Sequence, residues 1–168
     1  MKRILYVFIL FLTVVSCGPS FNSFYNNHKS DLGTTSFQVP RIVKTLIGTV
    51  SPEIDKAIGN ISDFKYIKFE ETNESKRADL IEEMNRVTNR RYTDVFRKHT
   101  LEHTQIISII EKGTVVSDIL IFKSDKEVTS ALYLKGDFNG NKIRSLSQEG
   151  DMENLGDALL KSYNSNLN

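Results

Sequence analysis

Two histidines and a glutamate stand close together in the string HTLEH at residues 99–103. Their order matches the H-x-x-E-H motif of inverted zinc peptidases, in which a helical turn places two imidazoles on one metal ion beside a glutamate general base. The string lies between two segments with the alternating pattern of β-strands, however. On one strand, residues i and i+4 are about 13 Å apart, too far to share one zinc ion. We therefore expect a polar hairpin turn, with metal binding by His99, Glu102 and His103 as the alternative.

A second candidate metal site is the string DFNGN at residues 137–141, which offers oxygen ligands at positions one, three and five of a calcium loop. The sixth position is Lys142 where a calcium loop has glycine, and the twelfth is Gln148 where it has a bidentate glutamate. A cation inside the ring opposes calcium binding. Asn139 followed by Gly140 instead predicts a turn with positive φ, and we expect neither a metal nor a cofactor.

Five basic residues gather around the end of a predicted helix: Arg86, Arg90, Arg91, Arg97 and Lys98. One interpretation is that they complement the helix dipole and pair with neighbouring acids, as Glu82 and Arg86 would at i, i+4 spacing. The other is that they contact anionic lipid at a membrane surface. The sequence leaves both interpretations open.

The only cysteine, Cys17, follows an apolar run that begins after Lys2 and Arg3. The run is shorter than the roughly 20 residues that cross a bilayer, and a short basic segment precedes it, which favours a secretory signal peptide. The string VVSC at residues 14–17 resembles the lipobox of bacterial lipoproteins. This resemblance implies removal of residues 1–16 and attachment of diacylglycerol, with fatty acids such as palmitate, to the Cys17 sulfur, because a thiolate is a good nucleophile for thioether formation.

Lipidation would anchor the mature chain to the bacterial cell envelope, since two or three acyl chains make membrane attachment effectively permanent. Gly18, a residue without an acidic side chain at the position after the cysteine, is compatible with export to the outer membrane. We therefore expect a protein bound to that membrane through Cys17.

The amino-acid composition limits the class of protein and the kinds of partner. The 168 residues are 39% hydrophobic and 26% charged, with a net charge of +1, an ordinary composition for one globular domain. Removing residues 1–16 leaves 20 basic and 21 acidic residues. A nearly neutral body lacks the concentrated basic face that nucleic-acid binding needs. A single cysteine also excludes an intramolecular disulfide.

An apolar stripe opens the mature chain. Ser20 is a typical N-cap residue, and aromatic residues recur after it at helical spacing up to the helix-ending Gly33. His28 falls on this stripe, so we expect it to pack rather than to bind a ligand. Cys17 and this first helix form the segment 17–33, which precedes the main domain.

Helical periodicity and strand alternation divide the rest of the chain. Further helices are expected over residues 40–50, 51–61 and 75–91, and after Asp151. Strands are expected over residues 34–39, 64–71, 92–98, 105–112, 115–122 and 128–135. We expect a loop over residues 138–151 and a disordered tail over residues 164–168. A helix between strands followed by successive hairpins predicts one α+β domain over residues 34–163, a two-layer domain with a mainly antiparallel sheet and helices packed on one face.

The lipobox, the segment FNSFYNNHKSDLGTTSFQVPRIVKTLIG at residues 21–48, and the late strand LYLKGDF at residues 132–138 together resemble the bacterial lipoprotein family called domain of unknown function 4252. The resemblance covers most of the mature chain. It implies an envelope lipoprotein and supplies no catalytic or binding residue beyond Cys17.

The sequence contains no G-x-S-x-G, P-loop, Cys/His nucleophile pair or dinucleotide fingerprint. We therefore expect a non-enzymatic binding or structural module of the cell envelope, with a membrane anchor and an envelope protein as partner. Two alternatives stay open: a metal-dependent envelope hydrolase that uses the HTLEH string, and a regulatory sensor of envelope stress.

Overall fold

The computed structural model describes residues 18–40, 58–70 and 72–149. The elements in chain order are α2 (Phe21–His28), β1 (Thr34–Pro40), β2 (Ile58–Glu70), α4 (Glu74–Thr88), β3 (Thr93–His99), β4 (Thr104–Lys112), β5 (Val115–Ser124), β6 (Val128–Asn139) and α5 (Gly140–Glu149). The predicted leader, Cys17, most of the helices over residues 40–50 and 51–61, the helix after Asp151 and the C-terminal tail lie outside the described residues. Pro40, predicted as the first residue of a helix, is instead the last residue of β1.

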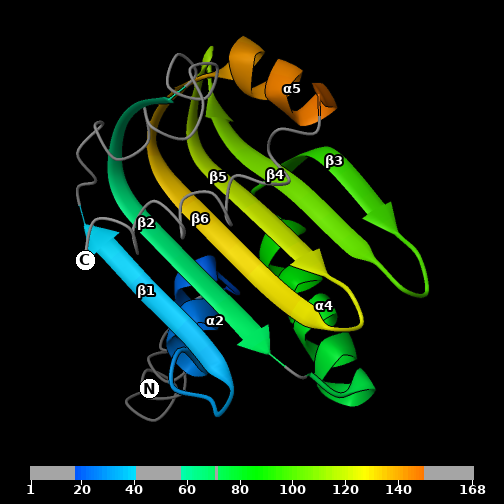
Figure 1. Ribbon diagram of the computed structural model, residues 1–168. Helices are drawn as coiled ribbons and strands as arrows, with labels where there is room; N and C mark the ends of the chain where they lie inside the picture. Colours follow the sequence, from blue (N-terminus) through cyan, green and yellow to red (C-terminus); the bar gives the residue numbers. More distant parts are fainter. Residues whose placement is uncertain (1–17, 41–57, 71, 150–168) are drawn as a thin grey trace, which may run out of the picture.

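All six strands form one antiparallel sheet in the order β1-β2-β6-β5-β4-β3 (Figure 1). The strands β3 to β6 follow one another as hairpins. The pairing of β2 with β6 then joins the β1–β2 part of the chain to the array of hairpins. The predicted mainly antiparallel sheet with helices is confirmed.

Helices α2 and α4 lie against the same face of the sheet (Figure 1). Ser20 caps α2, as predicted, because its hydroxyl accepts a hydrogen bond from the Ser23 backbone N–H at 3.2 Å. The Asn73 side chain caps α4 in the same way through the N–H of Lys76 at 2.8 Å. Both caps satisfy donors that have no partner inside the helix.

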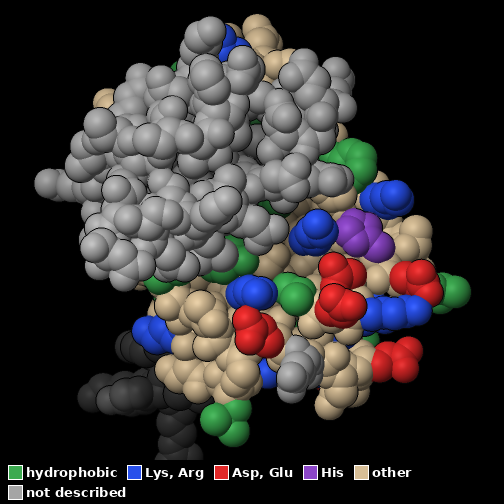
Figure 2. Space-filling view, in the orientation of Figure 1, with side chains coloured by type: hydrophobic (Ala, Val, Ile, Leu, Met, Phe, Trp, Pro, Cys, Tyr) green, Lys and Arg blue, Asp and Glu red, His purple; other side chains and the backbone are tan. Residues whose placement is uncertain are grey.

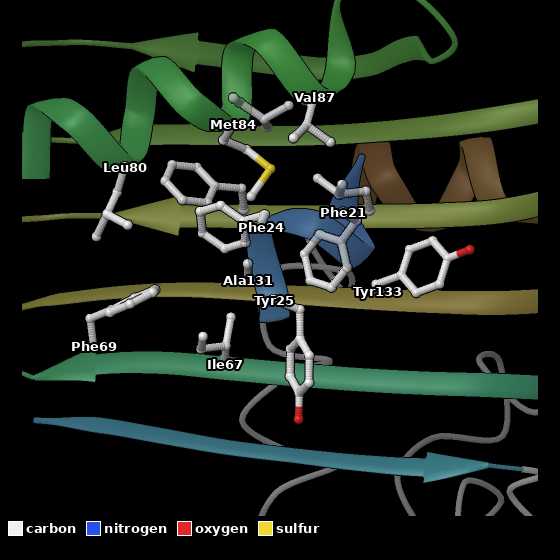
Figure 3. Close-up of a cluster of buried hydrophobic side chains, with 13 residues drawn as sticks. Phe21, Phe24, Tyr25, Ile67, Phe69, Leu80, Met84, Val87, Ala131 and Tyr133 are labelled. Carbon is white, nitrogen blue, oxygen red and sulfur yellow. The ribbon is translucent and has the colours of Figure 1, made fainter. Parts of the chain in front are cut away.

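A buried apolar cluster joins these two helices to the sheet (Figure 3). Its buried members are Phe21, Phe24, Tyr25, Ile67, Phe69, Leu80, Met84, Val87, Ile106, Leu120, Phe122, Ala131 and Tyr133. Phe24 and Met84 are fully buried where the helices meet. Removing this much aromatic and aliphatic surface from water is the main force that holds α2 and α4 on the sheet.

The other face of the sheet carries a second buried cluster, which includes Phe64, Ile107, Ile119 and Leu134. Ile143 of α5 belongs to this second cluster and not to the first. Both faces of the central strands are therefore apolar, as the continuous apolar runs of β4 and β5 predict. The arrangement in two layers, with the helices on one face, stays a prediction.

The structure corrects two predicted elements. Strand β2 begins at Ile58, where the spacing of Ile58 and Ile61 predicted the end of a helix. Residues 140–149 form α5, where a loop was predicted. The loop prediction was wrong because Asn139 acts as a helix cap: its side-chain oxygen accepts a hydrogen bond from the Lys142 N–H at 3.1 Å.

Within the described ranges, no helix combines the length and the apolar character that a membrane span requires.

Candidate functional site

The first described residues, Gly18, Pro19 and Ser20, lead directly into α2. Cys17, the predicted lipid-attachment residue, lies outside the described residues and is the next residue towards the N-terminus. Because consecutive Cα atoms are 3.8 Å apart, the Cα atom of Cys17 is at most about 11 Å from that of Ser20. The start of α2 therefore marks the region of the fold closest to the predicted anchor.

A pocket of about 220 Å³ opens at this same place, between the N-terminal end of α2, the C-terminal end of α4 and the sheet. Pro19 and Ser20 line it from the chain entering α2. Arg91 and Tyr92 line it from the segment after α4. Strands β4, β5 and β6 supply the rest of the wall, so segments distant in sequence converge here.

A β-bulge shapes the strand side of the pocket. Ile110 of β4 pairs with Asp118 and Glu111 pairs with Val116, which leaves Ser117 between them without a partner residue in β4. Bulges of this kind redirect side chains and are frequent beside functional sites. At this bulge, the Ser117 hydroxyl donates a hydrogen bond to Asp118 Oδ2 at 2.6 Å.

Asp118 also accepts a hydrogen bond on its other oxygen, Oδ1, from the Tyr133 hydroxyl at 2.5 Å. Burial, together with the nearby Asp118 carboxylate, raises the pKa of Tyr133 far above its usual value, and the same two causes raise the pKa of Tyr92. Both phenols therefore stay neutral at physiological pH. Figure 3 shows the Tyr133 hydroxyl directed away from the apolar cluster, while its ring stacks on Phe21 at 5.1 Å between centroids.

Three exposed cations, Arg91, Lys112 and Lys135, line the same pocket. None of the three forms an ion pair with another residue of the described ranges. The N-terminal end of α2 adds partial positive charge. The pocket therefore combines a positive rim with one carboxylate, Asp118.

A buried lysine connects α2 to the sheet next to this pocket. Lys65 is only 7% exposed, and its Nζ atom donates to Asp63 Oδ2 and to Asn22 Oδ1, each at 2.6 Å. The same Nζ lies 5.7 Å from the centre of the Tyr133 ring. A buried ammonium with a carboxylate and an amide as partners fixes the first turn of α2 in position.

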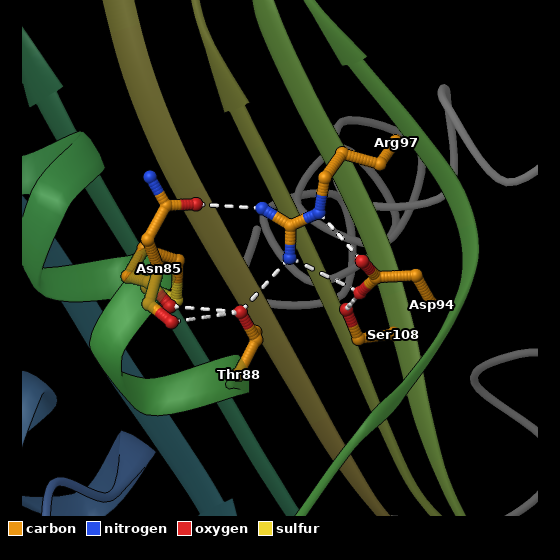
Figure 4. A network of polar contacts seen from close by, with 6 residues as sticks. Asn85, Thr88, Asp94, Arg97 and Ser108 are labelled. Carbon is orange, nitrogen blue, oxygen red and sulfur yellow. Dashed lines mark hydrogen bonds and ion pairs between the residues drawn. The ribbon is translucent and has the colours of Figure 1, made fainter. Parts of the chain in front are cut away.

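The predicted basic cluster does not form one surface patch. Arg86 pairs with Glu82 at 2.6 Å, as the i, i+4 spacing predicts, and Arg91 lines the pocket. Arg97 holds β3 to α4 instead, as Figure 4 shows. Over the described residues visible in Figure 2, basic and acidic side chains are interspersed and do not separate by sign.

The Arg97 guanidinium is hydrogen-bonded on three sides (Figure 4). It donates to both oxygens of Asp94, at 2.6 and 3.1 Å, to Asn85 Oδ1 at 2.6 Å and to Thr88 Oγ1 at 3.0 Å. Burial alone would raise the pKa of Asp94, but hydrogen bonds from Arg97 and Ser108 outweigh it and lower that pKa. A cavity of about 390 Å³ lies around this network, whose polar groups mostly bond to one another.

The HTLEH string forms the turn of the β3–β4 hairpin, not a helix. His99 Nδ1 lies 2.7 Å from Thr104 Oγ1, and Glu102 pairs with Lys126. The His103 backbone is held by Thr100 across the turn. No three His, Cys, Asp or Glu side chains within the described parts of the chain gather as a metal-binding group.

The DFNGN string spans the junction of β6 and α5, with Asp137 and Asn139 in the strand and Asn141 in the helix. Gly140 begins α5 and does not have positive φ, because only Gly33 and Gly113 adopt that conformation within the described residues. The predicted positive-φ turn at Asn139 and Gly140 was therefore wrong.

The sequence alone does not indicate that Asp118 and Tyr133 form a pair. Asp118 pairs with Lys135, so Tyr133, two residues earlier in β6, is its diagonal neighbour on the same face. The available signal was the polar pair Ser117 and Asp118, which interrupts the otherwise apolar strand β5.

Comparison with known proteins supports one relationship. No curated protein and no solved structure in the comparison matches the chain. The family model described as "Domain of unknown function (DUF4252)" matches residues 25–146, from within α2 to within α5, and so covers the whole described sheet. The chain therefore belongs to the DUF4252 family.

Proposed function

We propose that this protein is a lipid-anchored lipoprotein of the bacterial cell envelope, attached through Cys17 to the outer membrane, and that its α+β domain is a non-catalytic binding module. In this proposal the domain has two layers, with α2 and α4 on one face of the sheet, while Ile143 of α5 packs against the other face. The observation that carries the proposal is the direct passage from the lipobox-like sequence into α2, because only residues 18–20 separate Cys17 from the first helical residue.

So short a connection has a mechanical consequence. Three residues span at most about 11 Å between Cα atoms, less than the diameter of a small domain. Acyl chains contribute about 0.8 kcal/mol per buried methylene, so two or more chains would hold Cys17 at the bilayer permanently. The N-terminal end of α2, and the pocket beside it, would then face the lipid headgroups.

The chemistry of the pocket supports binding. The two hydroxyl groups that contact Asp118, from Ser117 and Tyr133, both donate to its carboxylate and so serve to position it. The cations on the rim, Arg91, Lys112 and Lys135, are exposed and available to an incoming anion. Charged groups placed around a small cavity suit the recognition of a polar ligand.

Metabolic labelling tests the anchor directly. Cells that express the full chain are grown with an alkyne-bearing palmitate analogue, and the purified protein is examined for label and by mass spectrometry. We expect label on the wild type and none on Cys17→Ser. The matched control Ser16→Ala keeps a small residue before the cysteine and should retain the label. Unlabelled wild type, or a leader still joined to Cys17, would contradict the proposal.

A further inference from the structure

We propose that the pocket at the N-terminal end of α2 binds the phosphoethanolamine headgroup of a membrane phospholipid, with the phosphate at the basic rim and the ammonium at Asp118. This proposal rests on the proposed function, because the anchor at Cys17 is what brings the pocket to the bilayer.

The charges of the pocket favour a ligand that carries both signs. Arg91, Lys112 and Lys135 give the rim three positive charges, none of them used in an ion pair within the described ranges. Asp118 supplies one negative charge on the strand wall of the same pocket. A simple anion would be attracted by the rim but repelled by Asp118. A zwitterion suits both the basic rim and Asp118, because its anionic end and its cationic end each form charge-assisted hydrogen bonds.

Asp118 is held ready for such a contact. Its oxygens each accept one internal hydrogen bond, from Ser117 and from Tyr133, and each carboxylate oxygen has a second lone pair. Because neighbouring hydroxyl groups fix its orientation, an incoming ammonium would meet a positioned carboxylate and not a mobile one. The N-terminal end of α2 also favours a nearby phosphate.

The size of the pocket also fits a headgroup. Its volume of about 220 Å³ lies below the range of roughly 300–1,000 Å³ that is typical of sites for drug-sized ligands. A phosphate joined to a two-carbon amine is a smaller group than such ligands. The chain that enters the pocket wall, Pro19 and Ser20, is the same chain that leads from Cys17, so a lipid in the same leaflet is the nearest source of such a group.

Water-soluble headgroup analogues test this proposal with the full chain in a nonionic detergent. Glycerophosphoethanolamine carries the phosphodiester and the primary ammonium. Glycerophosphocholine replaces the ammonium by a trimethylated group that donates no hydrogen bond, and glycerophosphoglycerol has no positive charge. Calorimetry or ligand-observed NMR gives the three affinities. We expect glycerophosphoethanolamine to bind tightest, by about tenfold, because it alone forms a charge-assisted hydrogen bond with Asp118.

Substitutions in the pocket distinguish the contacts of the phosphate from those of the ammonium. Asp118→Asn keeps an acceptor oxygen and should abolish the preference for glycerophosphoethanolamine while leaving the binding of glycerophosphoglycerol undiminished. Lys135→Gln should weaken all three compounds by several-fold. The matched controls Asp137→Asn and Lys98→Gln change charge on exposed strand positions outside the pocket and should leave every affinity unchanged. Lys135 is exposed, so its variant tests the proposal even if the Asp118 variant fails to fold.

Three results would overturn the proposal: an ethanolamine preference that survives Asp118→Asn, equal losses with Lys98→Gln and Lys135→Gln, or binding of free phosphoethanolamine without binding of glycerophosphoethanolamine. The last result would identify a free phosphomonoester as the ligand in place of a membrane lipid. These titrations do not depend on acylation. If the pocket does not bind the headgroup, the affinities show it; if Cys17 is not lipidated, the labelling experiment shows it.

Discussion

Replacing His28 with glutamine should destabilise the fold in a manner that depends on pH. The His28 ring lies at the end of α2 between two carboxylates, with Nδ1 at 2.9 Å from Asp31 Oδ2 and Nε2 at 2.9 Å from Glu83 Oε2. Carboxylates only accept hydrogen bonds, so in its protonated form the His28 ring donates one N–H to each of the two carboxylates. The ring thus ties α2 to α4 and to the loop that leads into β1.

The direction of the pH effect follows from two opposing shifts. Burial by itself lowers the pKa of His28, but the hydrogen bonds with Glu83 and Asp31 outweigh burial and raise that pKa above 6.5. A raised pKa in the folded state gives stability that is complete below about pH 6.5 and is lost as the pH rises through the folded-state value. Each pKa unit of difference between the folded and the unfolded state contributes about 1.4 kcal/mol to the free energy of unfolding.

Asp31 sets the acidic limit of the same interaction. The hydrogen bond from His28 is the largest cause that lowers the Asp31 pKa, with Lys76 also contributing. Its stabilising contribution is therefore present above about pH 3.8 and is lost as the pH falls through the lowered value. Together, the shifted pKa values of His28 and Asp31 should stabilise the protein most between about pH 4 and pH 6.5.

Urea unfolding at pH 5.5 and pH 9 measures the effect. Two charge-assisted hydrogen bonds at a partly buried site predict that His28→Gln lowers the free energy of unfolding by about 2 kcal/mol at pH 5.5 and by much less at pH 9. The control His103→Gln removes an imidazole that contacts no carboxylate in the described structure and should change little at either pH. A loss that is equal at both pH values, or an NMR titration that gives His28 a pKa of 6.5 or lower, would refute the reasoning.

Three further substitutions test the packing and the polar network by the same unfolding assay. Arg97→Gln removes the bonds between β3 and α4 and should cost about 1–2 kcal/mol, whereas its exposed neighbour variant Lys98→Gln should stay within about 0.5 kcal/mol of the wild type. Gly136→Ala places a Cβ 2.3 Å from the Asn60 carbonyl oxygen and should cost about 1–3 kcal/mol; an unchanged midpoint would show that β2 can move aside. Phe24→Ala empties a fully buried site and should cost about 3–5 kcal/mol, and a loss below 1 kcal/mol would contradict the packing described above.

Local sequence signals predicted most of the described elements. Runs of β-branched and aromatic residues identified β4 and β5 because those strands are apolar on both faces, and Ser20 marked the start of α2 because its hydroxyl is a natural cap. The start of β2 escaped prediction. Ile58 and Ile61 have helical spacing, but register shifts in their pairing with β6 break the period of two that a strand normally shows.

The candidate site was harder to predict because it depends on strand register. Asp118 and Tyr133 are fifteen residues apart in the chain and meet only because β5 and β6 are paired with Asp118 opposite Lys135. Asn139 shows a different difficulty. The same side chain suits a turn before glycine and the cap of a helix, and only the tertiary fold decides between them.

The pairing of β2 with β6, two strands far apart in the sequence, has a consequence for how the chain folds. Strands β3 to β6 are joined by short turns, so their contacts close small loops at little entropic cost. Pairing β2 with β6 must instead close a loop of more than fifty residues, as between Glu70 and Val128. Contacts of such high sequence separation slow folding, so we expect the hairpin array to assemble first and the docking of β2, with β1 beside it, to limit the rate.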